Sequence, residues 1–254
     1  MKRGQILLIT VMILATVLTV VLSVSFKSVT ETQVTKLEEE NEKTLAAAEA
    51  AIEEVLKTGS ASFGAGGLTD FGSFTGGAEV VSATTNSFTT PIIPKDGSYT
   101  FYLSEYNPET KTFTGGSLNN EDVEVCFQSA TTNPAIEITL VKTGGIFKYP
   151  VDPDKGSAGR MSSTVNPTSS ICAGDSSFNY AFSVPAAQIG ASSRFLVVRV
   201  LYQATRLHFY RSTNFPTQGK TVSSSAVSTS GVSKKITLFQ TYPQIPSEFF
   251  NTTF

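Results

Sequence analysis

The sequence contains few of the residues that nucleic-acid interfaces and catalytic centres require. Only 16% of its 254 residues are charged and the formal net charge is −2, so no basic surface is available to attract DNA or RNA. Histidine occurs once, as His208, and a Ser-His-Asp arrangement would have to use it. The chain has no GxSxG nucleophile motif and no GxxxxGK[ST] phosphate loop. We therefore predict no enzymatic activity, no cofactor and no direct binding of nucleic acid.

Charge is also missing from a long stretch near the N-terminus. No ionisable side chain lies between Arg3 and Lys27, and a helix over the 21 residues 6–26 would be roughly 30 Å long, the thickness of a bilayer core. Its Thr and Ser hydroxyls can bond back to carbonyls of the preceding turn. We predict a transmembrane helix there. Because Lys2 and Arg3 precede it, the N-terminus is expected in the cytoplasm and the bulk of the chain outside.

A cleaved secretory signal is the alternative interpretation of this apolar stretch. Such a signal has the same basic start, but it needs a shorter apolar core and a small-x-small cleavage site. The segment Ser23-Val24-Ser25 matches such a site poorly. The sequence therefore favours a retained membrane helix.

Glycine and proline are absent from residues 5–57, so the helix is expected to continue to Lys57 and to stop at Gly59. Its second half is amphipathic and is expected to pack against a domain or against neighbouring helices. A homodimeric coiled coil is a further interpretation, but the apolar stripe lasts only about three to four heptads. The polar Asn41 interrupts this stripe. The stripe comprises Val34, Leu37, Leu45, Ala48, Ile52 and Val55.

The rest of the chain changes in composition. Residues 58–77 are glycine-rich and are predicted to form a flexible, partly packed connector. Residues 78–254 are rich in β-branched and aromatic residues, which favour short strands. The predicted fold class is α+β: a long N-terminal helix followed by a β-rich, sandwich-like extracytoplasmic domain. The candidate strands are residues 79–86, 98–106, 123–129, 136–141, 146–149, 178–184, 195–202, 207–211, 221–227 and 235–241.

Three features of this domain are more specific. The strand 195–202 is nearly continuous in hydrophobicity and is expected to lie in the centre of a sheet. Gly144 and Gly145 are expected to form a tight hairpin connection. The apolar tail that begins at Tyr242 is expected to pack along the domain.

Cys126 and Cys172 are the two cysteines, and both lie on the side predicted to be exported. An even count in an oxidising compartment favours one disulfide, closing a loop of about 45 residues. Two buried free thiols are the alternative.

Two short motifs offer weak chemistry. Asp152 and Asp154 begin a D-x-D-x-G pattern like that of a calcium loop, but Ser163 occupies the position that an acidic residue should fill. We predict an ordinary turn there and no metal. Asn251-Thr252-Thr253 is a formal glycosylation acceptor, a pattern too short to carry an argument.

The first 57 residues resemble a type IV pilin-like protein and are most similar to PilX-type minor pilins. Three features match in order: the basic leader ending in Gly4, the apolar helix that begins at Gln5, and the Ala-Ala-Glu-Ala segment around Glu49. The resemblance implies that a prepilin peptidase cleaves after Gly4 and methylates the new terminus at Gln5. It also implies an inner-membrane subunit that enters a filament with its helix in the filament core.

Two positions depart from the major pilins. The first mature residue is Gln5 where those proteins carry Phe, and the fifth is Ile9 where they carry Glu. That Glu can neutralise a neighbouring subunit's amino terminus inside an apolar core, where an unpaired charge is costly. Ile9 cannot do so. Members of the family with a less strict pattern, such as minor pilins and the tip pseudopilin of type II secretion, tolerate the loss of this Glu. The resemblance therefore implies a minor, accessory or tip subunit.

We weigh two functions. The first is a structural or assembly role in a type IV pilus or a type II secretion pseudopilus, with other pilin-like subunits and the inner-membrane assembly machinery as partners. The alternative is a signal-anchored surface module that recognises a glycan or a protein through loops rich in Tyr and Phe. An enzyme is disfavoured because no acid-base pair at credible spacing is visible.

Overall fold

The structure is a computed structural model. It describes residues 3–62, 73–82, 84–114, 121–157, 159–160, 164–169, 171–246 and 249. The chain divides into two compact units. Unit 1 comprises Met1–Val80 and Val222–Leu238, and unit 2 comprises Val81–Thr221 and Phe239–Phe254. A long helix followed by antiparallel sheets makes the chain α+β, as predicted.

Unit 1 is built on one helix of 56 residues, α1 (Arg3–Thr58). It ends as predicted: Gly59 takes a positive φ of 91° and its N–H donates to the Val55 carbonyl at 2.8 Å, a left-handed cap that glycine adopts without steric cost. A sheet of order β1-β2-β13-β14 completes the unit. Its strands are β1 (Ser60–Ser62), β2 (Phe74–Val81), β13 (Gly219–Ser228) and β14 (Ser233–Thr241).

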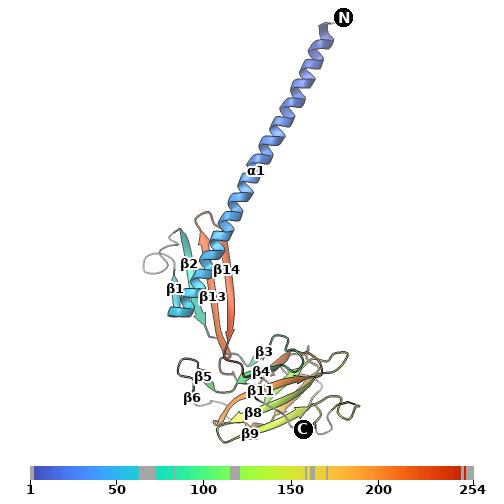
Figure 1. Ribbon diagram of the computed structural model, residues 1–254, viewed down its shortest axis with the longest axis vertical. Coiled ribbons are helices and arrows are strands. Elements are labelled where there is room, and N and C mark those ends of the chain that lie inside the picture. Colours follow the sequence, from blue (N-terminus) through green and yellow to red (C-terminus); the bar gives the residue numbers. More distant parts are fainter. Residues whose placement is uncertain are drawn as a thin grey trace. The chain divides into compact units, whose positions relative to one another are not determined.

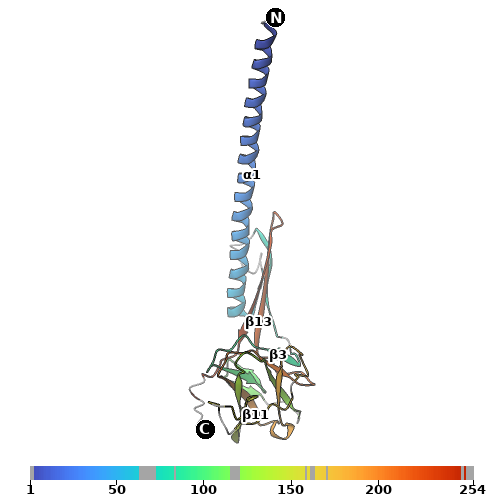
Figure 2. The same cartoon turned by 90° about the vertical axis from the view of Figure 1, so that its right-hand side faces the viewer.

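The last turns of α1 lie along one face of this sheet (Figures 1 and 2). Small residues form both surfaces of the contact: Ala47, Ala48 and Ala51 of α1 are fully buried, and Ala78 and Ala226 of the sheet face them. Alanine keeps the side chains short, so the helix and the strands approach closely. Ile52 and Val55 of α1 and Val222 of β13 add larger buried apolar side chains beside these alanines.

The predicted apolar stripe on this half of α1 is correct in part. Ala48, Ile52 and Val55 are buried, whereas Leu37 and Leu45 are 52% and 41% exposed. Thr44, Ala47 and Ala51 are buried in place of the exposed stripe members Val34, Leu37 and Leu45. The buried face of α1 is the face that carries the alanines, because their short side chains allow the sheet to approach most closely.

The segment expected as a connector, residues 58–77, differs from that expectation at both ends. Residues 60–62 form β1 and pair antiparallel with residues 77–79 of β2. The pairing depends on glycine, because a Cβ at Gly76 would collide with the Ser225 carbonyl and one at Gly77 with the Ala61 carbonyl. Residues 63–72 lie outside the described part of the chain.

Unit 2 contains two four-stranded sheets and a small hairpin. The first sheet has the order β10-β7-β12-β3, the second β4-β11-β8-β9, and β5 pairs with β6. The strands are β3 (Ser87–Thr89), β4 (Ser98–Tyr102), β5 (Glu105–Asn107), β6 (Thr112–Thr114), β7 (Val123–Phe127), β8 (Ala135–Lys142), β9 (Gly145–Val151), β10 (Tyr180–Val184), β11 (Ser193–Leu201) and β12 (Leu207–Tyr210), and one 3-10 turn, η2 (Ala186–Gln188), precedes β11.

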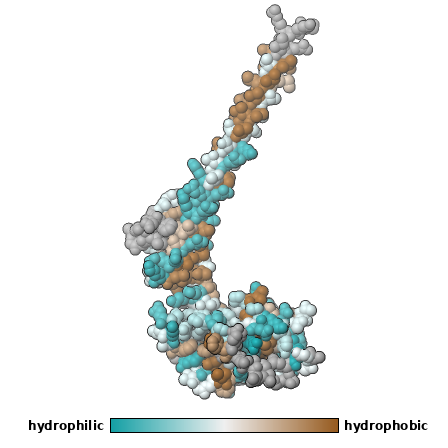
Figure 3. Space-filling model, viewed as in Figure 1, coloured by the Kyte–Doolittle hydropathy of each residue, from teal (hydrophilic) through white to brown (hydrophobic). Residues whose placement is uncertain are grey.

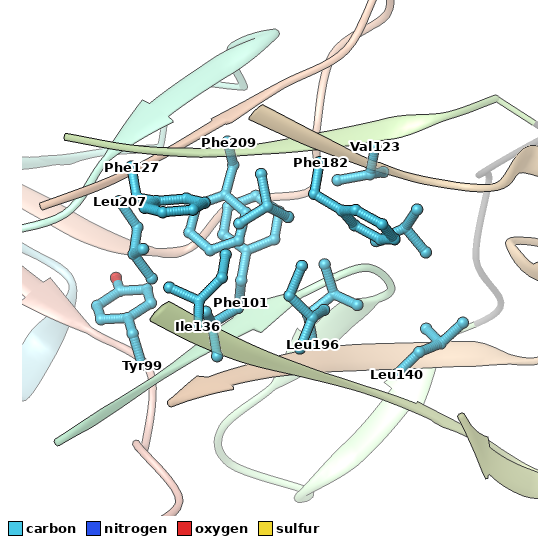
Figure 4. Packing of buried hydrophobic residues seen from close by; sticks show 14 of the residues in the cluster. Tyr99, Phe101, Val123, Phe127, Ile136, Leu140, Phe182, Leu196, Leu207 and Phe209 are labelled. Atoms are coloured by element: carbon cyan, nitrogen blue, oxygen red, sulfur yellow. The ribbon is translucent and has the colours of Figure 1, made fainter. Parts of the chain in front are cut away.

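The two four-stranded sheets share one apolar core, so unit 2 is sandwich-like (Figure 4). Phe127, Phe182 and Phe209 point inward from the first sheet toward Phe101 and Leu196 of the second. The Phe101 and Phe209 rings stack with centroids 4.0 Å apart. Alternation along each strand places these apolar residues on the inner face.

In the second sheet the predicted place of one strand is confirmed, whereas the hairpin turn lies one residue before the predicted Gly144 and Gly145. β11 lies between β4 and β8, the central place expected from its continuous hydrophobicity. β8 and β9 pair from Lys142↔Gly145 onward, so the hairpin turn falls at Thr143 and Gly144. The predicted strand 79–86 was wrong in extent, because the chain forms β2 before it and the separate strand β3 after it.

Residues 242–246, the described start of the predicted tail, pack along unit 2 and cover the free edge of β4. The Gln244 side-chain amide accepts from the Thr100 N–H at 2.7 Å, and the Gln218 amide accepts from the Tyr102 N–H at 2.8 Å and donates to the Tyr102 carbonyl at 2.9 Å. Each glutamine amide thus takes the place of a peptide group of a neighbouring strand. An exposed sheet edge is a site of unwanted pairing, and this one is closed by side chains.

Candidate functional site

The first half of α1 is an uninterrupted apolar rod. Leu7, Leu14 and Phe26 are each about 70% exposed, and the large apolar residues between them are 48% to 63% exposed. Figure 3 shows this half of the helix as a hydrophobic band, followed by a hydrophilic stretch. By length and composition α1 can cross a membrane. Among the described residues this band has no apolar partner within the chain.

Three threonine hydroxyls in this half bond back to the helix, as expected. Thr10, Thr16 and Thr19 donate at 2.8 Å to the carbonyls of Leu7, Ile13 and Ala15. A threonine bonded to its own helix presents mainly its methyl group to the surroundings, because the hydroxyl is already paired. These residues therefore do not interrupt the apolar surface.

The structure does not gather the residues singled out on α1 into one site. Gly4 and Gln5 lie in its first turns, where only the backbone is described, and Met1 and Lys2 of the proposed leader fall outside the described residues. Ile9 is 56% exposed in the apolar half. Glu49 is exposed on the other half, 40 residues later or roughly 60 Å along the helix at 1.5 Å per residue. These residues can act together only through contacts between different copies or with a membrane.

Cys126 and Cys172 form a disulfide, so the prediction of one bond is confirmed. The disulfide lies on the outer face of β7 and packs with Phe178 and Ala181. Glu124 lies beside the cysteines, and its carboxylate accepts from the Ala173 N–H at 2.8 Å. Because the two sulfurs are bonded to each other, they are not free to act as thiolate ligands for a metal. The disulfide ties the loop before β10 to the sheet.

His208 lies next to this disulfide, directly opposite Cys126 in the β12–β7 pairing. It is buried, and its Nδ1 lies 2.7 Å from the Thr89 hydroxyl. Burial lowers the pKa of the imidazole, and the nearby Asp175 carboxylate opposes this effect. Packed against the Phe178 ring, His208 is a buried histidine of strand β12.

The structure argues against calcium at Asp152 and Asp154. Asp152 is fully buried, and its carboxylate accepts two hydrogen bonds from the Arg160 Nε, at 2.9 and 2.8 Å. The Arg160 guanidinium also stacks on the Tyr202 ring, 4.2 Å from its centroid. A guanidinium already neutralises the carboxylate that a cation would need. Ser163 lies outside the described residues.

The sequence did not predict a groove of about 450 Å³ in unit 2, beside the hairpin β5–β6 that Figure 1 labels. Its polar lining comes from the hairpin and from residues more than 100 positions later in the chain. No local motif joins them. The groove is lined by Glu105, Tyr106, Asn107, Pro108, Glu109, Thr114, Thr217, Lys220 and Tyr242.

Two of the residues that line this groove, Tyr106 and Tyr242, belong to an aromatic cluster. The Tyr106 ring lies 5.2 Å from Tyr102, 5.2 Å from Phe113 and 5.6 Å from Tyr242, measured between centroids. Burial raises the pKa of Tyr102 to about 12, and the neighbouring Tyr106 and Tyr242 add to the effect. The Tyr102 phenol therefore stays neutral at physiological pH.

Comparisons with protein-family models, with curated proteins and with solved structures find no match to this chain.

Proposed function

We propose that this chain is a minor or accessory pilin-like subunit of a type IV pilus or a type II secretion pseudopilus, with a structural role in assembly. One observation carries the proposal: a single helix of 56 residues is apolar and exposed over its first half and packed on a sheet over its last turns. Such a helix can be held by a bilayer before assembly and by neighbouring helices afterwards, because both surround it with apolar groups.

The proposal includes processing at the start of α1. A prepilin peptidase would cleave after Gly4 and methylate the amino group of Gln5, which removes the charges of Lys2 and Arg3 from the mature helix. The partners would be this peptidase, other pilin-like subunits and the inner-membrane assembly machinery. The subunit would pass from a single-pass position in the inner membrane, with its N-terminus in the cytoplasm, to an extracellular filament. The disulfide supports an oxidising compartment for unit 2.

Ile9 supports a minor position, a tip position included. The mature amino terminus carries a positive charge, and burying it without a partner in a bundle of apolar helices costs several kcal/mol. An aliphatic side chain at the fifth mature position provides no partner to a neighbouring subunit. A subunit at low abundance or at the filament end faces this cost once, whereas a major subunit would face it at every step.

The experiment is N-terminal sequencing, together with the intact mass, of the protein extracted from membranes. The proposal expects a chain that begins at Gln5 and carries one added methyl group. A Gly4→Ala variant is the matched control, and it should keep the leader. A wild-type chain that retains Met1 to Gly4, or one that is cut near Ser25, would be incompatible with the proposal.

The second candidate is a membrane-anchored surface module that binds a glycan or a protein and never enters a filament. The groove beside β5–β6 favours it, because this groove combines aromatic rings with charged and amide groups. Replacing residues 6–26 with an unrelated membrane helix of equal length separates the two candidates. A binding module would still reach the cell surface and bind, whereas a filament subunit would lose assembly.

A further inference from the structure

The groove beside β5–β6 has the size and rigidity of a small-ligand site. Its volume of about 450 Å³ falls within the range of roughly 300–1,000 Å³ that ligand pockets occupy. The hairpin turn is held by Asn107, whose side-chain oxygen accepts from the Glu109 N–H at 2.9 Å and the Thr110 N–H at 3.2 Å. A site whose backbone is already ordered loses little entropy when a ligand binds.

The opposite side of the groove is fixed by a separate contact. The Thr217 hydroxyl lies 2.9 Å from the Tyr242 hydroxyl, and the Tyr242 N–H donates to the Gln218 carbonyl at 3.1 Å. The Tyr242 ring meets Tyr102 and Tyr106 edge-on. The aromatic cluster therefore connects the hairpin to the segment that contains Tyr242.

Three charged side chains border the groove, and each is available to a ligand. Glu105 and Glu109 are exposed, and Lys220 is half-buried. Within the described part of the chain none of the three forms an ion pair. Two carboxylates that only accept hydrogen bonds thus line the same groove as an ammonium group that only donates.

This combination selects the chemistry of the ligand. An anion would meet the net negative charge of the two carboxylates, and a simple cation would meet Lys220. An uncharged molecule with many hydroxyl groups suits all three, because each hydroxyl both donates and accepts. The apolar face of a sugar ring also packs on aromatic rings such as Tyr106, which stays half-buried in the groove.

We infer that this groove is a binding site for an uncharged saccharide. The inference rests on the second candidate function, a binding module in unit 2, and goes beyond it by naming the site and the ligand class. It does not depend on cleavage after Gly4 or on filament assembly. A filament subunit that carries this site would be adhesive.

The test uses the full chain in a polyoxyethylene detergent, which has no sugar headgroup. Saturation-transfer NMR measures binding of lactose, maltose, cellobiose and N,N′-diacetylchitobiose. At least one disaccharide should receive saturation, and its affinity should fall about tenfold in Glu109→Gln and in Lys220→Met, as for the loss of a hydrogen bond to a charged group. Both variants must keep the disulfide and the wild-type circular dichroism.

The matched control is Glu79→Gln, which removes an exposed carboxylate from a different groove, in unit 1. This variant should bind like the wild type. No saturation of any of the four disaccharides would overturn the inference. So would equal binding by wild type, Glu109→Gln and Lys220→Met, or a loss confined to Glu79→Gln. A negative result in this binding test would not change the N-terminal mass expected for the pilin-like subunit. The saccharide site and the pilin-like function can therefore fail independently.

Discussion

The first half of α1 and the core of unit 2 contain the same kinds of side chain in opposite surroundings. Leu7 and Leu14 are 69% and 73% exposed, whereas Leu196 and Phe209 are fully buried. Apolar surface left in water costs about 25 cal/mol per Å². Unit 2 avoids this cost through its own second sheet. The helix can avoid this cost only by contact with apolar groups outside the chain. In the function proposed above, a bilayer or neighbouring helices provide those groups.

The contact between α1 and its sheet is intermediate between these two. It is buried, but the buried residues are mostly small: Ala47, Ala48 and Ala51 against Ala78 and Ala226. One hydroxyl adds a polar contact, since Ser224 donates to the Ala48 carbonyl at 2.8 Å. The contact therefore combines close approach at the alanines with burial of a few larger side chains, Ile52, Val55 and Val222.

The sharpest test of the comparison removes one large side chain from each region. Phe209→Ala should lower the free energy of unfolding by about 3–5 kcal/mol, because it leaves a cavity between the sheets. Leu14→Ala should change it by less than about 0.5 kcal/mol, because that side chain has no partner in the chain. Urea unfolding in detergent measures both. A large effect of Leu14→Ala would show that the helix is packed within the subunit.

Removal of the disulfide tests how far unit 2 depends on covalent closure. The double variant Cys126→Ala and Cys172→Ala opens a loop with a sequence separation of 46. It should destabilise the protein by about 3–4 kcal/mol, since the unfolded chain regains the freedom of that loop. Chemical reduction of the wild type should lower the unfolding midpoint similarly. No change on reduction would contradict the prediction.

The close helix–sheet contact should reject a larger side chain. Ala51→Leu places three extra carbons against Ala78 and Val222 and should cost about 1–3 kcal/mol. Ala46 is exposed on the same helix, so Ala46→Leu is the matched control and should be close to neutral. Thermal unfolding of the two variants gives the comparison. Equal midpoints would mean that the contact is looser than the structure indicates.

The smallest effect expected is the pH dependence that His208 confers on unit 2. Its pKa in the folded protein lies below the ordinary 6.5, so the unfolded chain takes up the proton first. The stability due to the neutral imidazole is present above pH 6.5 and is lost as the pH falls toward the folded pKa, by up to about 1.4 kcal/mol per pH unit.

Urea unfolding between pH 7.5 and 5 measures this loss. His208→Gln keeps a group that can bond to Thr89 but does not titrate. This variant should have a flatter profile over the same window. An unchanged slope would assign the pH dependence to other groups.

The groove shows where sequence reasoning reached its limit. Glu105 and Glu109 lie close together in the chain, but Lys220 and Tyr242 join them only because β13 and the segment after β14 return to the hairpin β5–β6. The Asp152 pattern shows the same limit. We predicted an ordinary turn at this motif, but the partner of the Asp152 carboxylate is Arg160, whose position no local spacing predicts.

The sequence by itself determined the long helix, its end at Gly59, most of the strands, the central place of β11 and the cysteine pair. These features follow from local rules: the absence of Gly and Pro, the spacing of apolar residues and the count of cysteines. Only the tertiary structure decided which face of α1 is buried, that residues 60–62 form a strand, how glutamine amides close the edge of β4, and which charges border the groove. Those features depend on contacts between residues far apart in the chain. Such contacts produce no periodic pattern in the sequence from which they could be predicted.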